Sequence, residues 1–122
     1  MSPDPSNSAR TPEEAKLPPM AVYVLGLLRR VPDRPTVSDQ DAEAIQEGHL
    51  AQINRLREQG VLIVAGPIMD DGDLRGILIF RNLSLEEVRR LSEADPAVQR
   101  RRLMLELHEL YAPAGLGVGQ SV

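Results

Sequence analysis

The sequence contains no cysteine and no tryptophan, and its only aromatic residues are two tyrosines and one phenylalanine. Without cysteine the chain has no disulfide, no thiol nucleophile and no zinc site built on thiolates. So few aromatic rings argue against single-stranded nucleic-acid binding by base stacking. A net charge of −4 argues against attraction to phosphate backbones or anionic membranes, and two histidines are too few for a histidine-rich metal centre. We therefore expect no nucleic-acid, membrane or metal partner.

Long hydrophobic runs are also missing, because no stretch reaches the roughly 18 apolar residues that a membrane-spanning helix needs. Residues 1–19 are rich in proline and serine and lack the apolar core of a signal peptide. We interpret them as a disordered leader, residues 113–122 as a flexible C-terminal tail, and residues 20–112 as one ordered domain. Since no targeting signal is visible, the expected location is the cytoplasm.

The pattern between the tails predicts four strands and two helices. Ser38 is suited to cap the first helix, which Gly60 ends, and Ser84 with Glu87 forms a capping box for the second. The Gly66-Pro67 step is expected to break the second strand, and Asp95-Pro96 to end the second helix. The expected strands are residues 20–28, 61–65, 76–81 and 102–111, and the expected helices are residues 38–59 and 84–95.

This order is strand, helix, strand, strand, helix, strand, which is typical of an α+β, ferredoxin-like fold with a four-stranded antiparallel sheet. The two helices can cover only one face of that sheet. The first three strands are nevertheless apolar on both faces, so a second layer must cover the other face. A second copy of the chain, packed sheet to sheet about a two-fold axis, is the simplest candidate. We expect a homodimer or a higher homo-oligomer.

Residues spread over about positions 20–112 resemble the YciI-like (YCII-related) domain family. The resemblance implies a dimeric α/β barrel of ferredoxin-like subunits, with a His/Asp pair in a pocket and no cofactor. Some relatives are lyases, including chloride-eliminating enzymes, and others are similar to muconolactone isomerases. The matching positions are His49-Leu50, Leu56, Gly60, Ala65-Gly66-Pro67, Asp70, Gly76, Phe80, Ser84, Glu86-Glu87 and Asp95-Pro96-Ala97-Val98.

By this resemblance His49 and Asp95 are the catalytic pair, and Gly66 and Pro67 form the pocket wall. His49 lies four residues from both Ile45 and Ile53, so it shares the buried helix face. An imidazole shielded from water is favoured in its neutral form and can accept a proton. The alternative is a core histidine with one backbone hydrogen bond.

Asp95 is expected close to a helix C-terminus, where the helix dipole disfavours a carboxylate by about 0.3–1 kcal/mol. A hydrogen bond to His49 would compensate for this cost, whereas the alternative is an ordinary solvated helix stop. Asp70 is in a turn and is a candidate for the pocket mouth, because the surrounding aspartates do not have the spacing of a calcium-binding loop. Arg101 could bind an anionic group of the ligand, as could its neighbours Arg89, Arg90, Arg100 and Arg102, or these arginines could belong to a solvated helix face.

Taken together, the sequence predicts a small cofactor-independent enzyme that acts on a small organic, anionic metabolite. His49 would accept a proton and Asp95 would orient it, for a lyase-type or isomerase-type reaction. The alternative is a non-catalytic small-molecule-binding or dimerisation module of the same family.

Overall fold

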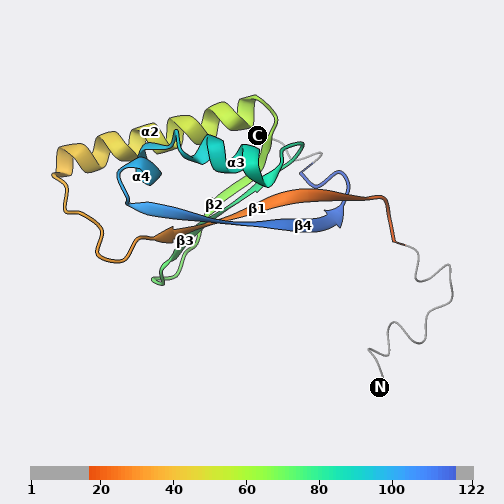
Figure 1. Ribbon diagram of the computed structural model, residues 1–122, viewed down its shortest axis with the longest axis horizontal. Coiled ribbons are helices and arrows are strands. Elements are labelled where there is room, and N and C mark those ends of the chain that lie inside the picture. Colours follow the sequence, from red (N-terminus) through yellow and green to blue (C-terminus); the bar gives the residue numbers. More distant parts are fainter. Residues whose placement is uncertain (1–16, 118–122) are drawn as a thin grey trace, which may run out of the picture.

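The computed structural model describes residues 17–117, and it contains one sheet with helices on one side (Figure 1). The sheet has four strands in the order β2-β3-β1-β4, and every neighbouring pair is antiparallel. This confirms the predicted α+β, ferredoxin-like fold. The elements are β1 (Met20–Arg30), α2 (Asp39–Glu58), β2 (Leu62–Pro67), β3 (Leu74–Phe80), α3 (Leu85–Ser92), α4 (Pro96–Gln99) and β4 (Leu103–Pro113).

The core lies between the helices and the sheet, and it is built from aliphatic residues with one aromatic ring. Alternate residues of β1 and β3 face it, as the two-residue period of a strand requires. On β4, the alternate residues Leu103, Leu105 and Leu107 pack against this core. The buried members are Val24, Leu28, Leu56, Leu62, Leu78, Phe80 and Val88.

The helix boundaries follow the predicted capping residues. Ser38 accepts a hydrogen bond from the Asp41 N–H at the start of α2. Ser84 and Glu87 form the reciprocal capping box at the start of α3. Gly60 has a φ of 79°, which is the left-handed conformation that ends a helix at little cost to glycine.

Most of the predicted strand bounds differ from the observed ones by one or two residues, and two predicted breaks in the chain are wrong. β2 continues through Gly66 and Pro67, and Pro67 pairs with Gly76. Because β2 is at the edge of the sheet, the missing N–H of proline does not interrupt a second ladder. The second helix also ends early, at Ser92, and Asp95 is instead the N-cap of α4.

The sheet face opposite the helices carries four apolar residues that we call the open-face row, namely Leu25, Leu27, Ile77 and Ile79. Register places Leu25 beside Ile79 and Leu27 beside Ile77 on this face. The same face of the sheet also holds a polar group, in which Glu106 accepts hydrogen bonds from the side chains of Arg29 and His108. The pKa of Glu106 is held below its usual value mainly by the bond with His108 and next by the bond with Arg29. Among the described residues, no helix covers this row (Figure 1).

The expected leader and tail fall only partly within the described residues. Of the leader, residues 17–19 are described and exposed. Of the tail, Pro113 completes β4, and the Leu116 N–H donates a hydrogen bond to the hydroxyl of Tyr23. Residues 1–16 and 118–122 lie outside the described part. Within it, no helix has both the length and the apolar character that crossing a bilayer would require.

Candidate functional site

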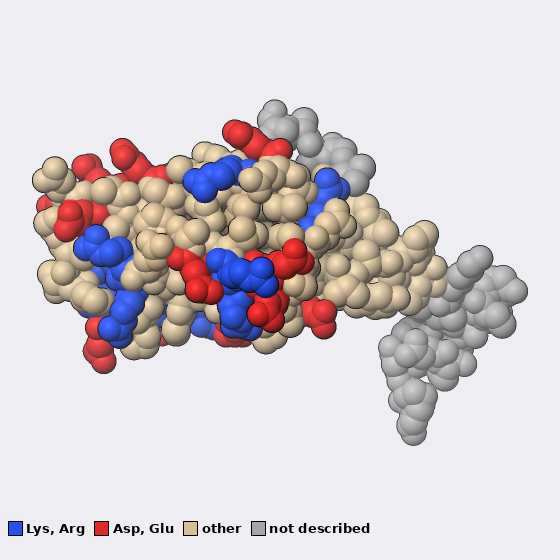
Figure 2. All heavy atoms as spheres, turned by 45° about the horizontal axis from the view of Figure 1, so that its top comes forward, with Lys and Arg blue, Asp and Glu red and all other residues tan. Residues whose placement is uncertain are grey.

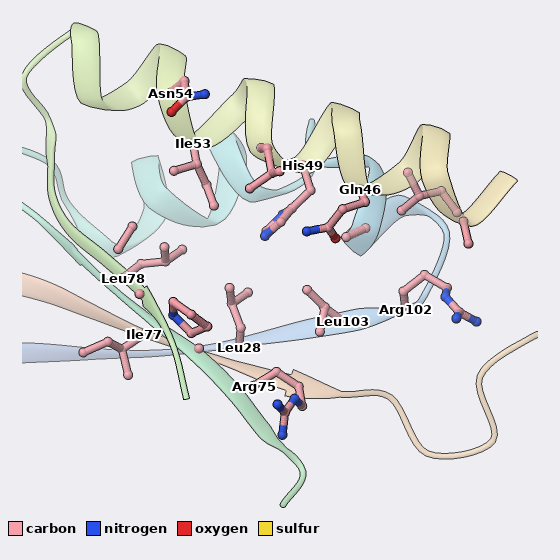
Figure 3. Close-up of a pocket in the computed structure, with 18 of the residues that line it drawn as sticks. Leu28, Gln46, His49, Ile53, Asn54, Arg75, Ile77, Leu78, Arg102 and Leu103 are labelled. Carbon is pink, nitrogen blue, oxygen red and sulfur yellow. The ribbon is translucent and has the colours of Figure 1, made fainter. Parts of the chain in front are cut away.

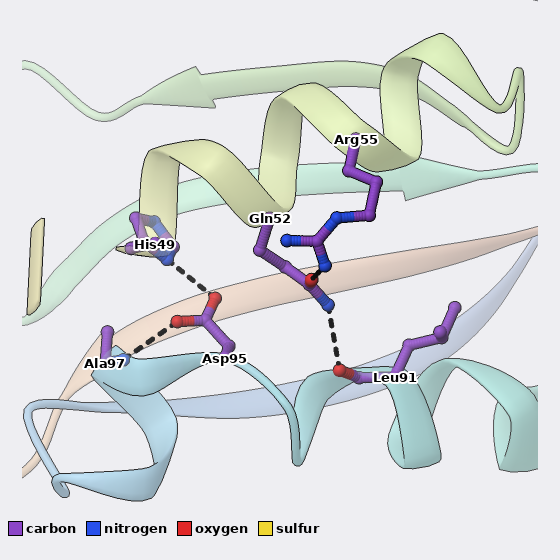
Figure 4. Close-up of polar contacts among 6 residues, drawn as sticks. All are labelled: His49, Gln52, Arg55, Leu91, Asp95 and Ala97. Carbon is purple, nitrogen blue, oxygen red and sulfur yellow. Dashed lines mark hydrogen bonds and ion pairs between the residues drawn. The ribbon is translucent and has the colours of Figure 1, made fainter. Parts of the chain in front are cut away.

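The structure brings His49 and Asp95 together as a buried pair (Figure 4). Nδ1 of His49 lies 2.7 Å from Oδ2 of Asp95, although the residues are 46 positions apart in the sequence. Each residue is only 7% exposed. A contact this short and this shielded from water is a strong charge-assisted hydrogen bond.

Asp95 is held in place by the turn that it begins. Its Oδ1 accepts a hydrogen bond of 2.8 Å from the Ala97 N–H, while its Oδ2 faces His49. Pro96 follows at the first helical position, where a missing N–H costs nothing. The carboxylate therefore sits at the favourable, positive end of a helical turn, which corrects the expectation of an opposing dipole.

Gly48 allows α4 to approach α2 closely enough for this pair to form. A Cβ at this position would lie 2.6 Å from Cγ of Pro96, which is shorter than two carbon atoms tolerate. Glycine inside a helix costs about 1 kcal/mol relative to alanine, so it is a poor choice for α2 by itself. Its presence beside His49 is explained by the proline ring that packs on it.

We predict that Gly48→Ala lowers both stability and turnover. The clash should cost about 1–3 kcal/mol, which exceeds the helix-propensity gain and moves Pro96, and with it Asp95, away from His49. Urea unfolding and a rate assay measure the two effects. Ala44→Gly, at an exposed position of α2, is the control, because it should destabilise without changing turnover. A more stable Gly48→Ala variant with unchanged turnover would contradict this role for Gly48.

The Asp95 contact determines which nitrogen of His49 can react. A carboxylate only accepts hydrogen bonds, so Nδ1 carries the hydrogen and the neutral ring leaves a lone pair on Nε2. Nε2 makes no hydrogen bond with any residue in the described range 17–117. The arrangement can therefore accept a proton at Nε2 and stabilise the resulting imidazolium through Asp95.

His49 faces a pocket of about 580 Å³ between α2 and the sheet (Figure 3). The helix contributes Ile45 and Ile53 beside His49, and the sheet contributes Leu28 and Leu78 opposite them. The pocket is large enough for a ligand with one small ring. Asp95 is not among the lining residues and lies behind His49, so a ligand would meet the imidazole rather than the carboxylate.

The remaining predicted site residues divide into two groups. Gly66 and Pro67 line the pocket. Asp70 and Arg101 do not line it. Asp70 is in the turn between β2 and β3, where its side chain accepts from the Gly72 N–H. Arg101 is exposed in a turn with a left-handed φ of 58°, and the next residue, Arg102, lines the pocket instead.

Arg34, which lines the pocket, and Gln52, which is buried on the same helix as His49, were not singled out from the sequence, whereas Arg102 belongs to the group of arginines considered for anion binding. Gln52 is 5% exposed, and its side chain donates to the Leu91 carbonyl while it accepts from Arg55, which joins α2 to α3 (Figure 4). Its spacing of three residues from His49 on the buried face was the available signal. Arg34 lies in the loop before α2, where only the folded chain shows that it borders the pocket.

Metal ligands are not grouped in the part of the chain that the structure describes. No set of three or more His, Cys, Asp or Glu side chains between residues 17 and 117 has a geometry that could hold a metal ion. Among the described residues, the candidate site therefore consists of the His49–Asp95 pair and the adjoining pocket.

One protein family and two solved structures are similar to this chain. The YCII-related domain family matches residues 27–104. Among solved structures, 5-chloro-2-hydroxyhydroquinone dehydrochlorinase from Burkholderia phenoliruptrix, in complex with 2,5-dihydroxybenzoquinone, superposes with a TM-score of 0.51 and 22% identity, covering 72% of this chain and 91% of the other. The de novo designed protein Ferredog-Diesel has a TM-score of 0.45 and 18% identity, with 72% and 84% covered. The sequence matches no curated protein.

Proposed function

The chain belongs to the YCII-related domain family, and we propose that it is a small enzyme that performs general acid–base chemistry on a small organic anion. His49 is the proposed base, and Asp95 orients it. The reaction class is an elimination or an isomerisation. The proposal needs no cofactor, because proton transfer and loss of a leaving group require no redox step.

One observation carries this proposal: Nδ1 of His49 is bonded to a buried carboxylate while Nε2 faces a pocket without a protein partner among the described residues. A core histidine with a purely structural role has no need of both features. Buried His–carboxylate pairs that open on a cavity are typical of acid–base sites.

The chemical steps follow from the position of Nε2. It takes a proton from an acidic carbon or hydroxyl of the substrate, and the electron pair left behind forms a new double bond. In an elimination, this pair displaces a leaving group such as chloride, which departs with its own bonding electrons. In an isomerisation, His49 returns the proton to another atom. The dehydrochlorinase of similar fold performs an elimination, and its structure contains the one-ring ligand 2,5-dihydroxybenzoquinone. Chlorinated compounds with one ring are therefore the first substrates to test.

Solvent exchange tests the proposal before any substrate is identified. The protein is incubated in D₂O with small acidic anions, among them a chlorinated hydroxyhydroquinone, and NMR follows deuterium uptake while an electrode follows chloride. We expect catalysed exchange or chloride release with at least one compound. Compounds that bind in the pocket but never exchange would favour the alternative, a non-catalytic binding module.

We also propose that a second copy of this chain covers the open-face row, so that the protein is a homodimer. The row places apolar side chains from β1 and β3 on a face that no described helix covers. These side chains are half-buried in the single chain, and partly exposed apolar patches mark interaction surfaces. Two identical patches can meet about a two-fold axis. The cytoplasmic location stays a prediction of the sequence.

Leu27→Lys should convert the dimer to a monomer. Leu27 is paired in register with Glu106, so a lysine is tolerated in the single chain but cannot be buried against an apolar partner surface. Light scattering at micromolar concentration measures the mass. Met69→Lys is the control, because Met69 is 91% exposed in the turn after β2 and should leave the dimer intact. A wild-type monomer would refute the dimer.

A further inference from the structure

The charge of the pocket is opposite to the charge of the whole chain. The protein has a net charge of −4, and Figure 2 shows acidic and basic groups interspersed over one face. The pocket lining nevertheless contains four arginines and no aspartate or glutamate. Such a lining creates a local positive potential that attracts anions. The four are Arg34, Arg57, Arg75 and Arg102.

These arginines differ in whether their guanidinium groups are free to bind a ligand. Arg75 donates to the carbonyl oxygens of Ile68, Asp70 and Gly72, so it holds the turn between β2 and β3. Arg102 donates through one nitrogen to the Pro35 carbonyl, which leaves its other donors available.

Arg34 and Arg102 both line the pocket, and the bond from Arg102 to the Pro35 carbonyl brings Arg102 close to Arg34. Together with Arg30, which does not line the pocket but is near enough to repel Arg34, they form what we call the arginine cluster. Within residues 17–117, none of the three takes part in an ion pair, and Nε of Arg30 is buried without a hydrogen-bond partner. The pKa of Arg34 is lowered mainly by partial loss of contact with water and next by repulsion from the charges of Arg102 and Arg30. Three neighbouring positive groups thus lack a counter-charge.

An anion at this point would relieve the repulsion and fill the open donor positions. The guanidinium group presents parallel N–H donors that match the two oxygens of a carboxylate. Leu103 lies between Arg102 and His49 in Figure 3, and Leu28 lies across the pocket from His49, so both offer an apolar surface for the body of a ligand.

We propose that Arg34 and Arg102, supported by Arg30, form a carboxylate-binding subsite that determines the substrate class of the pocket. The substrate is then a small organic acid. Its carboxylate lies at the arginine cluster, its apolar body lies on Leu28 and Leu103, and its acidic hydrogen faces Nε2 of His49. This inference rests on the proposed function for the role of His49, whereas the subsite itself requires only binding.

Binding of benzoate, followed by NMR titration, tests the subsite independently of catalysis. Arg34→Gln and Arg102→Gln should each weaken benzoate binding about tenfold or more, because each removes charge-assisted hydrogen bonds. Benzamide has the same shape without the charge, and its weaker binding should be unchanged. Arg89→Gln is the control, since Arg89 is exposed on α3 and does not line the pocket, and its loss should change benzoate binding less than about twofold.

Three results of these binding measurements would contradict the proposed subsite. Equal weakening by Arg89→Gln, equal loss of benzamide binding, or tighter binding of phenyl phosphate than of benzoate would overturn the carboxylate subsite. Arg34 is exposed, so its variant keeps the test valid if Arg102→Gln fails to fold. If benzoate binds as expected but no compound exchanges in D₂O, the proposed function fails and the subsite stands. If turnover occurs with KM unchanged in both arginine variants, the subsite fails and the proposed function stands.

Discussion

Replacing His49 with glutamine should reduce turnover by about 10²–10⁴-fold, the usual contribution of a positioned general base. The glutamine amide can still donate a hydrogen bond to Asp95, but it cannot accept a proton at neutral pH. The carboxylate therefore stays paired, and no buried charge is left alone. The measurement is the initial rate of exchange or elimination with the best substrate found, at saturating concentration.

Two controls separate a catalytic loss from a structural one. The thermal unfolding of His49→Gln should remain close to that of the wild type, and its binding of benzoate should persist. His108→Gln removes the other histidine, which is exposed on β4 and bonded to Glu106, and it should retain full turnover. Retained turnover in a folded His49→Gln protein would show that His49 is not the base.

Asp95→Asn should have an effect of similar size with a different cause. The amide of asparagine can donate to Nδ1, which favours the tautomer with hydrogen on Nε2 and removes the lone pair from the pocket. In the serine-protease triad, the corresponding change lowers kcat about 10⁴-fold. Here we expect a loss of about 10²–10⁴-fold, again the contribution of one general base.

Stability measurements distinguish the two roles of Asp95, which are to cap α4 and to orient His49. Asparagine is as good an N-cap as aspartate, so Asp95→Asn should keep the cap of α4, whereas Asp95→Ala should lose about 0.5–2 kcal/mol. Urea unfolding compares the variants, and the rate assay should show both to be impaired. An active Asp95→Asn enzyme would mean that the tautomer of His49 does not govern the reaction.

Local signals in the sequence were sufficient for most of the fold. Ser38, Ser84 and Gly60 mark helix ends through hydrogen bonds within a few residues, so their effect can be predicted without tertiary structure. The position of Pro67 could not be predicted in this way, because only the strand order shows that β2 is an edge strand.

The site was harder to predict, because its partners are distant in sequence. His49 was placed on a buried helix face by spacing alone, but its pairing with Asp95 came from the family resemblance. The sequence Asp95-Pro96 fits both the end of one helix and the start of the next. The structure shows that the second interpretation applies, and the sign of the local dipole reverses with it.

Which of three consecutive arginines borders the pocket also depends on tertiary structure. Arg100, Arg101 and Arg102 are consecutive, so composition and charge do not distinguish them. The backbone reverses at Arg101 with a positive φ, which leaves Arg101 exposed and directs Arg102 to the pocket. Such a turn in a non-glycine residue has no reliable sequence signal.

The most direct test of His49 as the base is the protonation state of each of its ring nitrogens, measured by ¹⁵N NMR on the wild-type protein at neutral pH. We predict that the neutral form of the ring carries hydrogen on Nδ1 and a lone pair on Nε2, and that Asp95→Asn shows a different pattern. A ring with hydrogen on Nε2 in the wild type, or a spectrum unaffected by Asp95→Asn, would contradict the proposed base.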